Sequence, residues 1–229
     1  DVMLIILAVI MAASVMDAAG GIDFLVRVAE RIIRANPKYV TIVAPLTTWS
    51  FSFVAGTGHI VYPLLPVIYE TAHQNGIRPE RPMAVATIAS QQAITASPVA
   101  AATAAMIGLF AEKGLNAWGL PEILMICVPA TLAGVVAAAF ISMFLGKDLK
   151  DDPEYQARLL AGQIPVPKAA ADRPPLKPAA RLSAFLFLAG VALVVLFGFF
   201  PEVRKLPGAK SAIGMPIVIE VVMMAIAAI

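Results

Sequence analysis

The sequence predicts an all-α, polytopic bundle of transmembrane helices. Hydrophobic residues make up 60% of the 229 positions and charged residues only 14%, whereas about 25% of the residues of a soluble domain are charged. A membrane span needs about 20 consecutive apolar residues. Runs that are almost free of charge cover residues 2–22, 40–67, 83–110, 123–145, 182–200 and 213–229. Because a water-soluble fold could not bury this much apolar surface, we expect several of these runs to cross the membrane.

Both ends of the sequence lie in or beside apolar runs. Asp1 leads directly into the first run, and Ile229 ends the last. A secretory signal peptide would carry a basic region before its apolar run and a small-residue cleavage site after it, and this pattern is not found here. We therefore expect the first run to be a membrane span and the chain to be a piece of a longer protein, truncated within its last helix.

Residues 23–36 predict an amphipathic helix that lies in the membrane interface, because apolar and charged side chains occupy opposite faces at helical spacing. The apolar face comprises Phe24, Leu25, Val28, Ala29, Ile32 and Ile33, and the charged face comprises Arg27, Glu30, Arg31 and Arg34. Cytoplasmic loops are enriched in Lys and Arg. These arginines, with Lys38, therefore place this flank in the cytoplasm and predict that the first span enters from the periplasm.

Residues 39–69 carry no formal charge, but at about 1.5 Å per residue they are too long for one ordinary span and too short for two spans with a turn. Gly56-Thr57-Gly58 lies near the middle, and glycine commonly ends a helix in the left-handed conformation. We expect two half-helices to meet at a tip there, with positive φ at the glycines, Gly58 included. Arg78 and Arg81 favour a cytoplasmic second flank, which makes residues 40–69 a re-entrant hairpin.

A second interruption divides the apolar run of residues 83–110. The polar residues within it are Gln91, Gln92, Thr95 and Ser97, the last followed by Pro98. Ser97 is a good N-cap residue, and Pro98 suits the first helical position because its missing N–H would be unpaired there. The sequence therefore predicts a broken helix whose second half begins at Pro98, in mid-membrane.

The rest of the chain predicts further spans joined by loops. Residues 111–121 hold one basic residue, Lys113, and should be periplasmic. Residues 1–146 would then form a membrane bundle. Residues 147–181 carry many charges and repeated prolines, so we expect a poorly ordered cytoplasmic linker, with a regulatory or partner-binding role as the alternative. Residues 182–229 would supply further transmembrane helices.

The two interruptions bring polar groups to membrane depth, where non-helical backbone is tolerated only beside protein or a water-filled cavity. A half-helix N-terminus offers unpaired N–H groups and about half a positive charge, which suits a carboxylate or another anion. Paired interrupted helices near the midplane are typical of the binding sites of secondary transporters. The candidate substrate-binding residues are Gly56, Thr57, Gly58, His59, Gln91, Gln92, Thr95, Ser97 and Pro98.

Structural roles stay open for the same residues. Glycine and proline are common in membrane helices, where they mark kinks or close helix contacts. His59 could contact substrate, exchange a proton, or be a neutral histidine bonded to a neighbouring helix. Gln91 and Gln92 could bind substrate or only bridge helices.

Several functional classes find no support in the sequence. No His, Cys or carboxylate cluster has metal-ligand spacing, and there is no Gly-x-Ser-x-Gly motif or phosphate-binding loop. We therefore expect no enzyme activity, no metal and no cofactor. A formal net charge of +2, without a basic face, argues against nucleic-acid binding. The single cysteine, Cys127, lies in an apolar run, where packing is its expected role.

At these positions the sequence resembles the anaerobic C4-dicarboxylate transporter (Dcu) family. The similarity follows the chain in order through most of its length. The stretches that carry it are Ala18-Ala19-Gly20-Gly21-Ile22-Asp23, Asn36-Pro37-Lys38-Tyr39-Val40, Gly56-Thr57-Gly58-His59, Leu65-Pro66-Val67-Ile68, Arg78-Pro79-Glu80-Arg81-Pro82, Ile94-Thr95-Ala96-Ser97-Pro98 and Gly146-Lys147-Asp148-Leu149. Each motif alone is weak, and the set is specific.

The resemblance implies a multi-pass protein of the bacterial inner membrane, of which this chain is one half of an inverted-repeat secondary transporter. It implies exchange of fumarate, malate or aspartate for succinate during anaerobic growth, with the tip and the second interruption forming half of the substrate site. A C4-dicarboxylate and the lipid bilayer are then the expected partners, and a homo-oligomer is left open. Two other functions stay open: a membrane scaffold or gating subunit of a larger complex without transport activity, and an ion-coupled carrier of another organic anion.

Overall fold

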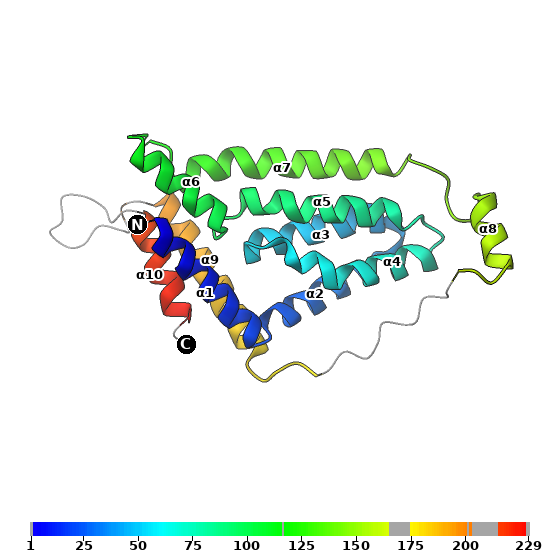
Figure 1. Ribbon diagram of the computed structural model, residues 1–229, viewed down its shortest axis with the longest axis horizontal. Coiled ribbons are helices and arrows are strands. Elements are labelled where there is room, and N and C mark those ends of the chain that lie inside the picture. Colours follow the sequence, from blue (N-terminus) through cyan, green and yellow to red (C-terminus); the bar gives the residue numbers. More distant parts are fainter. Residues whose placement is uncertain (1, 116, 165–174, 201, 203–214, 228–229) are drawn as a thin grey trace.

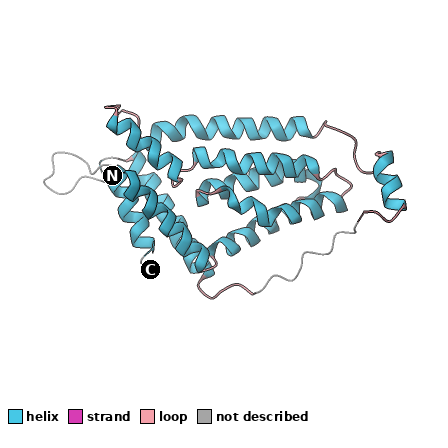
Figure 2. Ribbon diagram, viewed as in Figure 1, coloured by secondary structure: helices cyan, strands magenta, loops and turns pink. Residues whose placement is uncertain are grey.

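The computed structural model describes residues 2–115, 117–164, 175–200, 202 and 215–227. Every regular element within these residues is helical (Figure 2), which confirms the predicted all-α class. The α-helices are α1 (Val2–Ala18), α2 (Gly21–Ala35), α3 (Val40–Ala55), α4 (Leu65–Gln74), α5 (Glu80–Ala96), α6 (Ala101–Glu112), α7 (Leu120–Ser142), α8 (Pro153–Leu160), α9 (Ala180–Phe199) and α10 (Met215–Ala227). The 3₁₀ helices η1 (Pro37–Tyr39) and η2 (Gly58–Leu64) precede α3 and α4.

The helices form two groups (Figure 1). α3, α4, α5 and α7 run alongside one another, whereas α1, α9 and α10 pack together at an angle to them, and α2 contacts both groups. Val40, Ile60 and Ile68 belong to the buried core of the first group. Phe187 and Ile219 belong to the core of the second. The interruptions that concern function lie in the first group, where it meets α6.

Within the part of the chain that the structure describes, three helical segments are long and apolar enough to cross a membrane: Glu80–Glu112, which contains the interruption between α5 and α6, Leu120–Ser142 and Ala180–Phe199. α7 presents large apolar side chains outward, among them Phe140 and Ile141, and a surface of that kind suits lipid rather than water. α3 has 16 residues, fewer than the roughly 20 of a complete span. The architecture is therefore that of a membrane helix bundle in which α3 is shorter than a typical span.

The amphipathic helix predicted at residues 23–36 is α2, and protein covers most of its apolar face. Leu25, Val26, Ala29 and Ile33 are buried, and α2 packs against α3, η2 and α4. Leu25 lies in the core that contains Phe187 of α9, and Ile32, on the same predicted face, is exposed. Helices of both groups therefore cover most of the apolar stripe, and its position in the membrane interface stays a prediction.

An ion-pair network fastens α2 to α4. Arg34 donates from Nε to Glu30 Oε1 at 3.0 Å and from Nη2 to Glu70 Oε2 at 2.7 Å, and Gln74 Nε2 donates to Glu70 Oε1 at 3.1 Å. Burial lowers the pKa of Arg34, but its hydrogen bonds to Glu70 and Glu30 outweigh this effect and raise the pKa overall. Glu70 is only 5% exposed, so the pair keeps an almost buried carboxylate compensated.

Part of the predicted linker is ordered. Residues 153–160 form α8, and Asp152 caps this helix by accepting hydrogen bonds from the N–H groups of Glu154 at 3.0 Å and Tyr155 at 3.3 Å. The expected poor order is therefore wrong for α8. Pro153 occupies the start of the helix, where proline is favoured, so a proline that suggested disorder instead begins a capped helix. Residues 165–174 of the linker lie outside the described residues.

Candidate functional site

The first interruption lies between α3 and η2. Gly56 follows α3 in the left-handed region, with φ 68°, and its N–H donates to Ser52 O at 2.9 Å. Thr57 is extended, and its Oγ1 accepts a hydrogen bond from His59 N–H at 3.3 Å. The chain then turns back through η2 into α4, and both pack against α3. Gly56 therefore has the predicted positive φ. The positive φ predicted for Gly58 is wrong, because Gly58 is the first residue of η2.

The second interruption separates α5 from α6, and its details differ from the prediction. Ser97 is the C-cap of α5, with φ −77° and ψ 132°, and its Oγ accepts a hydrogen bond from Val99 N–H at 3.3 Å. α6 begins only at Ala101, so the expected start at Pro98 with Ser97 as its N-cap is wrong. Proline disfavours the helical conformation in the residue before it. Pro98 is therefore consistent with the end of α5 at Ala96, but it does not start α6.

The two interruptions touch (Figure 1). A Cβ atom placed on Gly56 would lie 2.9 Å from Val99 O and 3.2 Å from Ala100 N, well inside the normal contact distance of about 3.5–4.0 Å between non-bonded heavy atoms. A Cβ atom placed on Gly58 would lie 2.6 Å from Gln91 Nε2. Both glycines thus let the tip approach α5 and the second interruption more closely than a residue with a side chain would.

Polar side chains lie on the open side of this junction. Gln91, Gln92 and Thr95 are exposed on α5 and share one face, because helix positions three or four apart are neighbours. Thr95 Oγ1 donates to Gln92 O at 2.7 Å. Exposed amides would lack hydrogen-bond partners in lipid, so we expect water, substrate or protein to contact this face. Of the other candidate residues, His59 is exposed, Gly56 and Thr57 are half-buried, and Gly58, Ser97 and Pro98 are buried.

Two buried hydroxyl groups beside the interruptions were not among the candidate residues predicted from the sequence. Ser52 Oγ and Thr103 Oγ1 have no hydrogen-bond partner among the described residues. Ser52 lies one turn before Gly56, and Thr103 lies in the first turn of α6. A buried polar group without a partner costs about 1–3 kcal/mol, so water or a ligand would stabilise both. Their only sequence signal was a small hydroxyl residue close to a predicted interruption in an apolar run.

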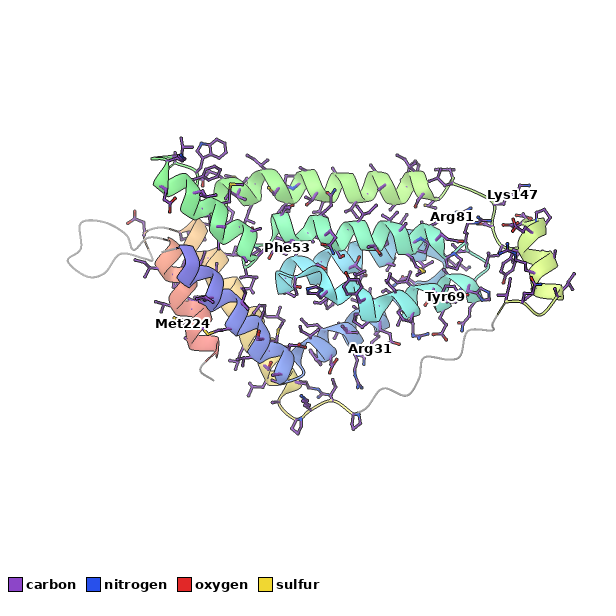
Figure 3. All side chains as sticks on the ribbon, viewed as in Figure 1. Arg31, Phe53, Tyr69, Arg81, Lys147 and Met224 are labelled. Carbon is purple, nitrogen blue, oxygen red and sulfur yellow. The ribbon has the colours of Figure 1, made fainter. Side chains whose placement is uncertain are left out.

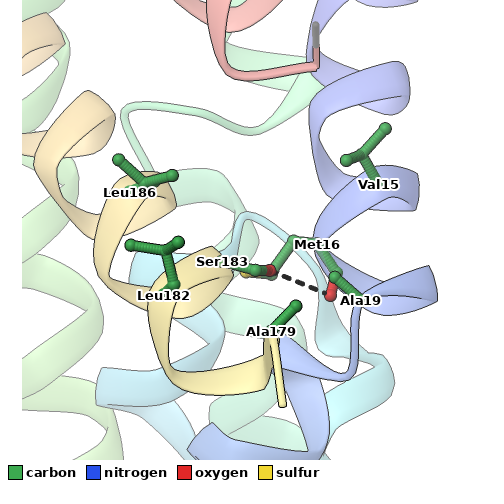
Figure 4. A pocket seen from close by; sticks show the side chains of 7 residues that line it. All are labelled: Val15, Met16, Ala19, Ala179, Leu182, Ser183 and Leu186. Carbon is green, nitrogen blue, oxygen red and sulfur yellow. Dashed lines mark hydrogen bonds between the residues drawn. The ribbon is translucent and has the colours of Figure 1, made fainter. Parts of the chain in front are cut away.

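A separate apolar pocket of about 100 Å³ lies between α1 and α9 (Figure 4). Ser183 Oγ donates to Met16 O beside it, at 3.4 Å. The lining residues are Val15, Met16, Ala19, Ala179, Leu182, Ser183 and Leu186. None of them is charged, so this pocket offers an anion little compensation for its lost hydration. The candidate site therefore stays at the junction of the two interruptions.

Comparison with known proteins gives consistent matches. The family model described as anaerobic C4-dicarboxylate membrane transporter matches residues 1–229. The chain is 41% identical over 197 residues to the C4-dicarboxylate transporter DcuA of Wolinella succinogenes, covering 86% of this chain and 44% of that protein. It is 37% identical over 230 residues to the anaerobic C4-dicarboxylate transporter DcuB of Escherichia coli O157:H7, covering 98% and 51%. The chain thus spans about half the length of these relatives, and no solved structure matches it.

Proposed function

Because the chain belongs to the anaerobic C4-dicarboxylate membrane transporter family, we propose that the complete protein is a secondary transporter that exchanges fumarate, malate or aspartate for succinate across the bacterial inner membrane. The observation that carries the proposal is the junction of the tip with the second interruption, where Gly56 approaches the backbone of Val99. Paired interruptions of this kind are typical of substrate sites in secondary transporters.

At the junction, hydrogen-bond donors would hold one carboxylate of the substrate. The first-turn N–H groups of α6 have no intrahelical acceptor and carry about half a positive charge. Thr57, His59 and Gln91 add a hydroxyl, an imidazole and an amide. Each hydrogen bond to a charged group contributes roughly 1.5–3 kcal/mol. His59 is assigned a hydrogen-bonding role, because exchange of fumarate for succinate swaps one dianion for another and needs no net proton movement.

The second carboxylate would be held by the part of the protein that this chain does not include. The chain spans about half the length of its relatives, and the amides of Gln91 and Gln92 are exposed. An inverted repeat that covers this face would complete the site around Thr95, Ser97 and Pro98. Residues 1–146 and 182–229 would then form membrane parts joined by a cytoplasmic segment, residues 147–181.

The hairpin of residues 40–69 is proposed to enter and leave the membrane on the cytoplasmic side. Cysteines introduced at Lys38 and Asn75, which are both exposed, should therefore react with an impermeant thiol reagent from the cytoplasmic side only. The measurement is labelling of the full-length protein, with Cys127 and any other cysteine replaced, in right-side-out and inverted vesicles. Labelling of either position from the periplasm would make this stretch a complete span and end the hairpin proposal.

Counterflow tests the function itself. The full-length protein is reconstituted in vesicles loaded with succinate, and labelled fumarate is added outside. Uptake should be fast when succinate is present inside and should fall to the protein-free background when it is absent. Absence of counterflow, in protein shown to be folded by its melting transition, would contradict the proposal and favour a scaffold or gating subunit. Uptake that ignores internal succinate but needs an ion gradient would indicate an ion-coupled carrier of another organic anion.

A further inference from the structure

Arg81 ties the start of α5 to the end of α7. Its side chain is 9% exposed. Nε donates to Leu145 O at 2.6 Å, Nη2 to Gly146 O at 2.8 Å, and Nη1 to Asp148 Oδ1 at 2.6 Å. A basic side chain that binds carbonyl groups just beyond a helix C-terminus also compensates the negative end of the helix dipole. Figure 3 shows Arg81 and Lys147 at the end of the molecule that carries α8.

The same stretch is bound to the turn between α4 and α5. Leu149 N–H donates to Gly76 O at 3.1 Å, and the Leu149 side chain is only 6% exposed. Arg78 Nε donates to Lys147 O at 3.1 Å, and its guanidinium pairs with Asp152. Asp152 is also the N-cap of α8. One apolar anchor and several charge-assisted hydrogen bonds therefore fix this stretch to the turn.

A third contact joins α8 to α4. Tyr155 Oη and His73 Nε2 share a hydrogen bond of 2.7 Å, and the His73 ring stacks on Tyr69 with ring centroids 5.7 Å apart. Burial, with a smaller effect of Tyr69, raises the pKa of Tyr155, so the phenol keeps its proton. α4 is the return arm of the hairpin, so this contact reaches the element that leads back to the tip.

We propose that residues 145–156 are a permanent brace, which holds the outer ends of α4, α5 and α7 together so that the hairpin and the broken helix move as one body during transport. The proposal rests on the proposed function. Two interhelical hydrogen bonds support it within the bundle: Thr48 Oγ1 donates to Ala86 O at 3.1 Å and Trp49 Nε1 to Thr131 Oγ1 at 3.2 Å. These bonds join α3 to α5 and α7. The brace, these hydrogen bonds and the contact of Gly56 with Val99 thus all oppose movement of the tip relative to the second interruption.

A cysteine at Leu149 tests the brace directly. In full-length protein without other cysteines, Leu149→Cys should react slowly with N-ethylmaleimide in vesicles, and the rate should not change while fumarate and succinate are exchanging. Adding Arg81→Gln should raise the labelling rate about tenfold or more, because a hydrogen bond to a charged group is worth roughly 1.5–3 kcal/mol. Asp148→Asn, at an exposed position, is a milder second variant and should raise the rate in the same direction.

Arg158→Gln is the matched control. Among the described residues the Arg158 side chain pairs only with Glu154 of its own helix, at 2.6 Å, and both side chains are largely exposed. The variant should leave labelling unchanged. Faster labelling during exchange would show that the segment opens in each cycle and would overturn the permanent brace. Equal rates in Arg81→Gln, Asp148→Asn and Arg158→Gln would overturn it as well. The comparison in resting vesicles needs no transport, so it stays informative even if the exchange proposal fails.

Discussion

Alanine at position 56 is expected to abolish the exchange of fumarate for succinate in protein that still reaches the membrane. Gly56 has φ 68°, and a left-handed conformation costs a residue with a side chain about 1–2 kcal/mol. The new Cβ would also lie 2.9 Å from Val99 O and 3.1 Å from Val99 C. These are backbone atoms, which cannot swing aside as a side chain can, and overpacking typically costs about 1–3 kcal/mol. The tip and the second interruption would have to separate, which deforms the proposed site.

Gly114 provides the matched control. It has φ 74°, and nothing lies within 4 Å of its Cβ position, so Gly114→Ala shares the backbone strain without the collision. Exchange by this variant should stay close to wild type. Asparagine separates the two effects further, because it adopts the left-handed conformation more readily than alanine. Gly56→Asn should still abolish exchange, whereas Gly114→Asn should be neutral.

The measurement is the initial rate of counterflow per folded transporter, with folding checked by the melting temperature of the purified protein. If Gly56→Ala and Gly56→Asn exchange as fast as the two Gly114 variants, then the close contact of the two interruptions is not needed for transport. A lowered melting temperature without loss of exchange would give Gly56 a structural role alone.

The interruptions could be predicted from the sequence because their causes are local. A glycine readily adopts the left-handed conformation that ends a helix, and Pro98 disfavours the helical conformation in Ser97. The start of α6 was placed three residues too early, because proline is favoured at a first helical position but does not fix where a helix begins. Ser97 has the extended conformation that an N-cap residue would also have. The chain nevertheless stays outside the helix up to Ala100, the actual N-cap, and α6 starts at Ala101.

Contacts between distant segments could not be predicted in this way. Arg81 indicated only a cytoplasmic flank, yet it binds Leu145 O, 64 positions along the chain. Counting basic residues cannot predict such a partner, because the count contains no information on which segments are close in the fold. The apolar face of α2 shows the same limit. Helical spacing predicts the face, but whether lipid or protein covers it depends on packing against α3 and α4, for which the sequence of α2 carries no signal.

Valine at position 58 is expected to weaken exchange by displacing Gln91. The substitution should cause no left-handed backbone strain, because φ of Gly58 is not positive. The new Cβ would lie 2.6 Å from Gln91 Nε2 and 3.1 Å from Gln91 Cδ. This amide ends an exposed, flexible side chain, so the protein should fold with the amide pushed away from the tip. If Gln91 donates to the substrate, the apparent affinity for fumarate should fall about tenfold or more, the worth of one hydrogen bond to a charged group.

A double-mutant cycle separates displacement of Gln91 from direct obstruction of the substrate. In a Gln91→Ala background, Gly58→Val has no amide to displace, so it should lower the affinity further by less than about twofold, within the usual error of additivity. A full, additive loss would instead show that valine at position 58 acts independently of Gln91, as expected if the substrate lies against Gly58 itself. Gly134→Ala is the control, because its Cβ would meet Gln92 Oε1 at an ordinary 3.8 Å and should leave the affinity unchanged. Affinity is read from the fumarate dependence of counterflow, so a change in the number of active transporters does not alter it.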